Sequence, residues 1–273
     1  MTKGSQFIST GKSKHTKNKP FLTGSIFDER TAKSALTFFG TLIIVFFISF
    51  IACVSASFSS LLLRLLLNSA VIILALYILY NNGAKRGAED VTKGEILWQK
   101  KEKGQYFSDS EKEMSFHVLK GFVNGMLGSI PFIILGIVLA FNTTIQMTES
   151  GALPSWMQAY TNRNDIGKAL VNYLQPEGMN IIDFIRMIVR ITILPFVNIV
   201  GTGNKTGVLW IERLSPIILM LPALSYGAGY MSGRSIRAQV HTAINENERK
   251  RIRREKKKTR NIIQTRKEPD KLN

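Results

Sequence analysis

Residues 36–80 have the sequence LTFFGTLIIVFFISFIACVSASFSSLLLRLLLNSAVIILALYILY, and this stretch decides the fold of the chain. Residues 34–63 contain no charged side chain, and after Arg64 residues 65–84 contain none either. Two apolar segments of about 20 residues each match a hydrocarbon core about 30 Å thick. The stretch therefore predicts two antiparallel transmembrane helices joined by a short turn.

The whole sequence has the composition of a membrane protein with soluble extensions. Of its 273 residues 45% are hydrophobic, and its charged residues are grouped in blocks rather than spread evenly. We predict an all-α, polytopic membrane helix bundle with four transmembrane helices and one amphipathic helix, which lies at the outer interface or is re-entrant. The predicted spans are about residues 36–57, 61–80, 118–141 and 214–232.

The spans divide the chain into a membrane domain and two polar ends. Residues 1–35 are rich in Gly, Ser, Thr and Lys and have few residues able to form a core, which predicts disorder. The transmembrane domain covers residues 36–232. The other predicted segments are a charged cytoplasmic loop at 81–117, with a short surface helix at 88–103, an outer loop at 142–180 and a basic cytoplasmic tail at 233–273.

The distribution of charge predicts the orientation of the chain. The formal net charge is +17, and the excess lies in the two ends. Residues 1–35 hold seven Lys and Arg against two Asp and Glu, and residues 233–273 hold fourteen against five. Loops rich in Lys and Arg stay on the cytoplasmic side of a membrane. We therefore expect a multi-pass protein of the cell membrane with both termini in the cytoplasm.

Residues 181–200 decide the number of spans. On a helix, Asp183, Arg186 and Arg190 share one polar stripe, and thirteen Ile, Leu, Phe and Val residues cover the rest. The charges near its middle cost roughly 7–10 kcal/mol, and the apolar residues return roughly 4–8 kcal/mol, so an isolated span is marginal. A fifth span would also carry the basic tail outside. The segment is therefore predicted to lie in the outer interface or to dip in and return.

The same stripe is a candidate polar cleft. Asp183, Arg186 and Arg190, together with Arg64 near the outer end of the second span, could bind a headgroup, a peptide or an ion. The alternative is a structural helix whose polar face meets water or headgroups, with the Arg64 side chain reaching to the interface. The sequence leaves both alternatives open.

Glycines mark the expected helix contacts. Gly121 and Gly125 have the spacing of small residues that lets two helices approach closely, and Gly229 and Gly233 repeat this spacing in the fourth span. The candidate helix-packing residues are Gly121, Gly125, Gly128, Gly229 and Gly233.

The tail after the fourth span begins as a helix with one apolar face and then becomes polybasic. Each cation held close to an anionic leaflet contributes about 1 kcal/mol of attraction. Binding to ribosomal RNA through its phosphates is the alternative, with a steep salt dependence. We favour lipid because the tail is already attached to the membrane. The candidate lipid or nucleic-acid contacts are Arg249, Lys250, Arg251, Arg253, Arg254, Lys256, Lys257, Lys258 and Arg260.

The motifs typical of catalysis or of metal binding are absent from the sequence. Cys53 is the only cysteine, which excludes an internal disulfide and a cysteine-based metal cluster. His15, His117 and His241 stand far apart and belong to no zinc-binding motif. We therefore expect a protein that is not an enzyme and that uses no cofactor and no metal.

The leading prediction is an accessory or scaffold subunit of a membrane complex whose basic tail binds anionic lipid. Its expected partners are the bilayer, anionic phospholipid headgroups, and other membrane subunits or further copies of itself. A first alternative is a small oligomeric transporter or channel that uses the stripe Asp183, Arg186 and Arg190. A second follows from Arg64 and the basic tail, an outline that resembles insertases of the YidC class and implies a tail that binds the ribosome. The span pattern differs from that class, and Arg64 lies near the outer surface.

Overall fold

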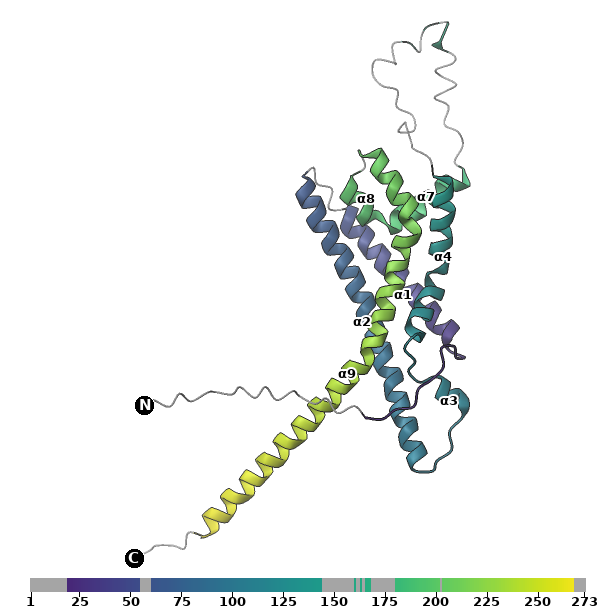
Figure 1. The fold of residues 1–273 in the computed structure, drawn as a ribbon. Helices are drawn as coiled ribbons and strands as arrows, with labels where there is room; N and C mark the ends of the chain where they lie inside the picture. The colour runs from purple at the N-terminus through teal and green to yellow at the C-terminus, as the bar shows by residue number, and fades with distance from the viewer. Residues whose placement is uncertain are drawn as a thin grey trace, which may run out of the picture.

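The computed structural model describes residues 19–54, 60–143, 160, 163, 165–167, 180–201 and 203–267, with only the backbone described for Val54 and for 260–267. Within these residues every regular element is a helix. The helices are α1 (Thr31–Val54), α2 (Leu61–Glu102), α3 (Asp109–Glu113), α4 (Lys120–Asn142), α7 (Ile181–Thr192), α8 (Leu194–Val200) and α9 (Lys205–Lys267), as Figure 1 shows.

Four of these helices, α1, α2, α4 and α9, are long and apolar enough to cross a membrane. For the described residues, the prediction of an all-α fold with four helices that could span a membrane is confirmed. The helices continue beyond the predicted spans, since α1 begins at Thr31, α2 ends at Glu102 and α9 begins at Lys205. Each long apolar segment is thus continued by polar helical turns, which a prediction from hydropathy leaves out of the span.

The prediction of a separate surface helix at residues 88–103 is wrong, because α2 runs without a break from Leu61 to Glu102. Gly94 within this helix allows close packing, since a Cβ atom there would lie only 2.6 Å from the Leu22 carbonyl oxygen. The helix ends just before Gly104, whose φ of +67° suits glycine.

Close contact between backbones joins α2 to α9. A Cβ atom at Gly83 would lie 2.1 Å from the carbonyl oxygen of Tyr226, and one at Gly229 would lie 2.0 Å from that of Tyr80. Gly233 meets the backbone of α2 in the same way. Because glycines on both helices face the partner backbone, the two helices approach more closely than side chains would allow.

The glycines of α4 pack against two other helices. Gly121 and Gly125 lie against Tyr230 and Ala223 of α9, whereas Gly229 and Gly233 of α9 face α2. Gly128 packs against Ala35 and Phe38 of α1. Helix α9 therefore lies between α2 and α4, with Gly229 and Gly233 on the α2 side.

The predicted disorder does not hold for residues 19–35; residues 1–18 lie outside the described part. The Leu22 N–H donates to the Gly94 carbonyl at 3.1 Å, and the Gly24 N–H donates to that of Phe116 at 3.0 Å. The polar composition of this segment concealed these long-range hydrogen bonds, which fix it against α2 and the segment before α4.

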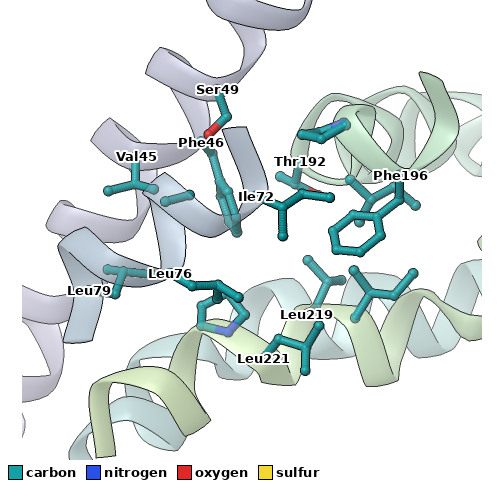
Figure 2. A pocket seen from close by; sticks show the side chains of 15 residues that line it. Val45, Phe46, Ser49, Ile72, Leu76, Leu79, Thr192, Phe196, Leu219 and Leu221 are labelled. Carbon is teal, nitrogen blue, oxygen red and sulfur yellow. The ribbon is translucent and has the colours of Figure 1, made fainter. Parts of the chain in front are cut away.

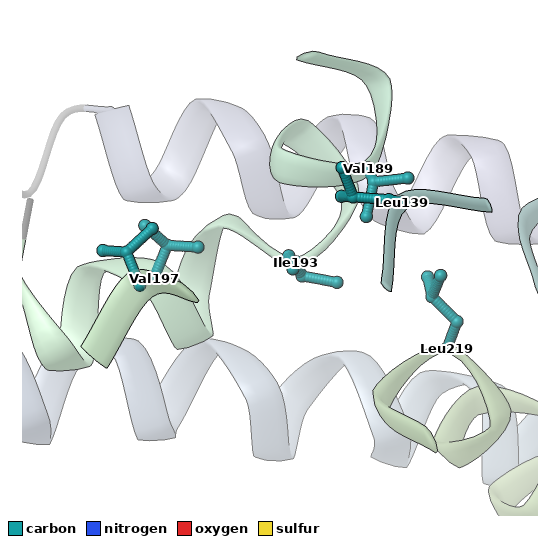
Figure 3. Packing of buried hydrophobic residues seen from close by; sticks show 6 residues of the cluster. Leu139, Val189, Ile193, Val197 and Leu219 are labelled. Carbon is teal, nitrogen blue, oxygen red and sulfur yellow. The ribbon is translucent and has the colours of Figure 1, made fainter. Parts of the chain in front are cut away.

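Helices α7 and α8 form a bent pair at the end of the bundle opposite residues 19–30 (Figure 1). The helical conformation is interrupted at Ile193. Helix α7 has 12 residues and α8 has 7, so neither approaches the length of about 20 residues that a span needs. The bend is buried: Val189, Ile193 and Val197 pack with Leu139 and Leu219 of α4 and α9 (Figure 3).

Candidate functional site

Five polar side chains meet between α4, α7 and α9 in what we name the charged cluster. Two of its members, Arg186 and Glu212, are almost fully buried, which is unusual for charged residues. The members are Thr143, Asp183, Arg186, Arg190 and Glu212.

Glu212 is the centre of the charged cluster. Its side chain is only 2% exposed. Arg190 Nε donates to Glu212 Oε1 at 2.5 Å, and the Thr143 hydroxyl donates to Oε2. Arg186 Nε lies 3.6 Å from the same Oε2. The carboxylate thus satisfies both oxygens inside the protein, as a buried charge requires.

Arg186 joins all three helices. Its Nη2 donates to the Thr143 hydroxyl at 3.2 Å, and its Nη1 lies 3.4 Å from Asp183 Oδ1. The spacing within α7 explains this arrangement, since residues three and four apart lie on one helix face. Asp183 is fixed in turn by a capping box with Asn180 at the start of α7.

The arrangement balances its own charge, because two guanidinium groups face two carboxylates. Arg190 is the more accessible arginine, with its side chain 34% exposed against 8% for Arg186. Buried ions of this kind are stable only when they are paired. The charged cluster therefore holds α7 against α4 and α9. Of the two arginines, Arg190 is the one that solvent or a headgroup can reach.

The structure brings Asp183, Arg186 and Arg190 together but places Arg64 elsewhere. The Arg64 guanidinium lies against Gly201, where an added Cβ atom would be 2.4 Å from Nη1. Gly201 has a φ of +87°, so both the backbone and the arginine favour glycine there. Arg64 Nε is buried and has no hydrogen-bond partner among the described atoms. Arg64 thus contacts the end of α8 from the start of α2.

Thr143 and Glu212 are the members of this site that the sequence pattern does not reveal. Glu212 stands beside Arg213 and just before an apolar run, and so resembles a charge that ends a span. The sequence offers one signal, which is the balance of charge. Two arginines on an apolar helix need a carboxylate partner, and few Asp or Glu residues lie near the spans.

The opposite end of the bundle has its own buried polar contacts. Asp28 and Lys120 pair at 2.8 Å, and the Tyr230 hydroxyl donates to Asp90 Oδ2 at 2.8 Å. Burial alone would raise the pKa of the Asp28 carboxyl. Hydrogen bonds from Lys120 and Thr31 and the charge of Lys120 outweigh burial and hold this pKa below its usual value.

Helix α9 continues beyond the bundle as what we name the α9 extension, residues 234–267. Figure 1 shows it leaving the bundle obliquely, at the end where residues 19–30 lie. Ile236, Val240 and Ile244 are exposed on one side of it. Arg251 is 81% exposed and pairs with Glu255 at 3.2 Å. The exposed basic residues are Arg249, Lys250, Arg251, Arg253, Arg254, Lys256, Lys257 and Lys258, and for Arg260 the side chain lies outside the described part.

A small apolar cavity lies between α1, α2, α9 and the bend between α7 and α8 (Figure 2). Its walls are aliphatic and aromatic, with hydroxyl groups from Ser49 and Thr192 only. Without a charged group in its lining, the cavity suits an apolar chain rather than a polar ligand. In the described ranges, no three His, Cys, Asp or Glu side chains gather as a metal site would require.

Comparison of the sequence with protein-family models gives no match, and comparisons with curated proteins and with solved structures give none either.

Proposed function

We propose that this protein is a non-enzymatic accessory or scaffold subunit of the cell membrane whose α9 extension binds anionic phospholipid. The observation that carries the proposal is one uninterrupted helix that crosses the bundle and then presents exposed apolar and basic side chains. An apolar stripe beside many cations is typical of helices that lie in a lipid interface.

The dimensions of the extension are compatible with this role. At 1.5 Å per residue, residues 234–267 measure about 50 Å, and Arg249 lies about 22 Å along the helix from Arg234. The apolar side chains of Ile236, Val240 and Ile244 come first and the basic run follows. A helix leaving obliquely needs only a modest further tilt to bring both against headgroups, where each cation contributes about 1 kcal/mol.

We further propose that α7 and α8 form a re-entrant pair at the outer face and that both chain ends are cytoplasmic. The buried bend at Ile193 supports the first part, because Arg186 before it bonds to Thr143 at the end of α4, and Gly201 after it packs against Arg64 at the start of α2. The excess of Lys and Arg in both chain ends supports the second part.

The alternatives receive less support. A transport pathway lined by Asp183, Arg186 and Arg190 would expose charge, but these side chains are directed at one another and at Glu212. The insertase alternative uses Arg64, which packs against Gly201. Its tail prediction stays open, because a basic helix also attracts RNA.

An environment-sensitive fluorophore on the α9 extension tests the lipid proposal. The label is attached to Ile252→Cys in a Cys53→Ser background, and the full-length protein is placed in nanodiscs of phosphatidylglycerol or of phosphatidylcholine. We expect a blue-shifted, brighter signal in the anionic discs only, and a return to the aqueous signal at 1 M salt, where the Debye length falls to about 3 Å.

A variant with Arg249, Lys250, Arg251 and Arg253 changed to Gln should lose the signal, and a label at Gln105 should give none. Equal signals in both lipids, or a signal that survives in the variant, would contradict the proposal. Ribosome co-sedimentation that depends on the same four cations would instead support the insertase alternative.

A further inference from the structure

We propose that a small pocket at the base of the α9 extension binds a phosphomonoester, either on a lipid headgroup or as free phosphate. The pocket is a shallow depression, open to solvent, between the N-terminal segment, α2 and α9. Four of its eight lining residues are basic, and one is acidic. The residues that carry the argument are Lys19, Phe21, Glu95, Arg234, Arg237 and His241.

The only carboxylate of the pocket is already occupied. Glu95 Oε2 accepts from Arg237 at 3.0 Å, and Glu95 Oε1 lies 2.7 Å from His241 Nε2. Both Glu95 and His241 are buried, so this group forms the floor. Lys19 and Arg234 stand exposed at the mouth, with no ion pair to any described carboxylate. Two cations are thus left for a ligand.

Arg234 is held in position for such a ligand. Its guanidinium carbon lies 5.5 Å from the centre of the Phe21 ring, a cation–π contact. A guanidinium stacked on a ring keeps its N–H groups free to donate in the plane, which suits the oxygens of a phosphate. The contact therefore orients the arginine without using its hydrogen-bond donors.

The wall that carries Phe21 is fixed. Phe21 meets Phe116 edge to face, with ring centres 6.0 Å apart, and Leu22 next to it bonds to the Gly94 carbonyl. A site built on a fixed wall loses less entropy when it binds than one that must form around its ligand.

The charge of the pocket selects the ligand class. Two unpaired cations match a phosphomonoester, which carries between −1.5 and −2 charges near neutral pH. A phosphodiester carries one charge, and a zwitterionic headgroup carries none overall. The pocket uses none of the cations at 249–260, so it is independent of the lipid contact proposed for the α9 extension.

Native mass spectrometry of the full-length protein in detergent tests this site. The probes are phosphatidic acid, phosphatidylglycerol and phosphatidylcholine, each added at the same concentration. We expect one tightly retained phosphatidic acid per chain, with weaker phosphatidylglycerol and weakest phosphatidylcholine binding. Lys19→Gln and Arg234→Gln should each weaken phosphatidic acid binding about tenfold, because each removes a charge-assisted hydrogen bond.

Arg213→Gln is the matched control, since Arg213 also stacks on an aromatic ring, that of Trp210, but at the other end of α9. Competition by inorganic phosphate would identify free phosphate as a ligand, and its failure would assign the site to lipid. Equal binding of phosphatidic acid and phosphatidylglycerol, or equal loss in Arg213→Gln and Arg234→Gln, would overturn the proposal. The four-glutamine variant of the extension should keep the single bound lipid, which separates this result from the fluorescence test.

Discussion

Asp28 and Lys120 form an ion pair of 2.8 Å in which each side chain is only 3% exposed. The pair connects the segment before α1 to the first turn of α4. Lys120 Nζ also donates to the Glu113 and Ser115 carbonyls, at 3.2 and 3.4 Å. Asp28 accepts from the Thr31 hydroxyl at 2.8 Å. This one contact therefore fixes the start of two spanning helices.

Replacing Lys120 with Met should destabilise the protein strongly. The change leaves the Asp28 carboxylate buried without its cation, a loss that costs about 3–5 kcal/mol. Lys100→Met is the control, because the Lys100–Glu111 pair is exposed and should contribute less than about 1 kcal/mol. Chemical unfolding of both variants in detergent measures the difference, and equal effects would refute the argument.

Acid should abolish the contribution of the Asp28–Lys120 pair. Because the folded-state pKa of Asp28 is lowered, the pair stabilises the fold fully above the ordinary carboxyl value of 3.8. The contribution is lost as pH falls from there through the folded pKa. The difference in unfolding free energy between the native protein and Asp28→Asn should therefore be constant near neutral pH and shrink below about pH 4. A constant difference down to pH 2 would contradict this account.

Glu212→Gln should damage the charged cluster more than Arg190→Gln does. The first change leaves Arg186 buried without its central carboxylate, at a cost of about 3–5 kcal/mol. The second removes a side chain that is one-third exposed and leaves Glu212 close to Arg186, so it should cost less. Thermal unfolding of the two variants tests the order. If Arg190→Gln proves the worse variant, Arg190 rather than Arg186 depends on Glu212.

Gly83→Ala should weaken the contact between α2 and α9. The new methyl group would meet the Tyr226 carbonyl oxygen at 2.1 Å, so the helices must separate, which costs about 1–3 kcal/mol. Gly40→Ala in α1 is the matched control, because a Cβ atom there meets nothing within 4 Å. That change should stabilise α1 by about 0.5–1 kcal/mol through helix propensity. Unfolding midpoints in detergent distinguish the two.

Labelling of single cysteines should report the proposed orientation. In a Cys53→Ser background, a membrane-impermeant reagent added to intact cells should label Gly203→Cys, which lies between α8 and α9, but not Gln105→Cys, which follows α2. Permeabilised cells should label both positions. Labelling of Gln105→Cys in intact cells would place the basic ends outside and reverse the proposed topology.

Hydropathy predicts the spanning helices because a bilayer imposes length and apolarity on each span separately. It does not predict where a helix stops once it leaves the lipid. Helix α2 continues to Glu102 because its glycines contact α9 and the N-terminal segment, a packing effect that acts between distant parts of the chain. Taken one segment at a time, the same glycines are typical of helix breaks.

The candidate site also has a part that the sequence predicts and a part that it does not. The helical spacing of Asp183, Arg186 and Arg190 is a local property and predicts that they share a face. Their partner Glu212 stands 22 residues beyond Arg190, and Thr143 stands 43 residues before Arg186. Such partners depend on how helices pack, which periodicity does not encode. Arg64 could be located along its span but not relative to α8, for the same reason.

The contact between α2 and α9 can form only late in the synthesis of the chain. Tyr230 and Asp90, which bond across it, are 140 residues apart in the chain. At roughly 5–20 residues per second of synthesis, the glycine face of α2 waits about 7–28 seconds for its partner. During that interval the glycine face of α2 lies against lipid or a chaperone, and Asp90 has Lys93 of its own helix as a partner but not yet Tyr230. Helix α9 completes the bundle of described helices, so a chain truncated before α9 should be recognised by quality control as incompletely folded.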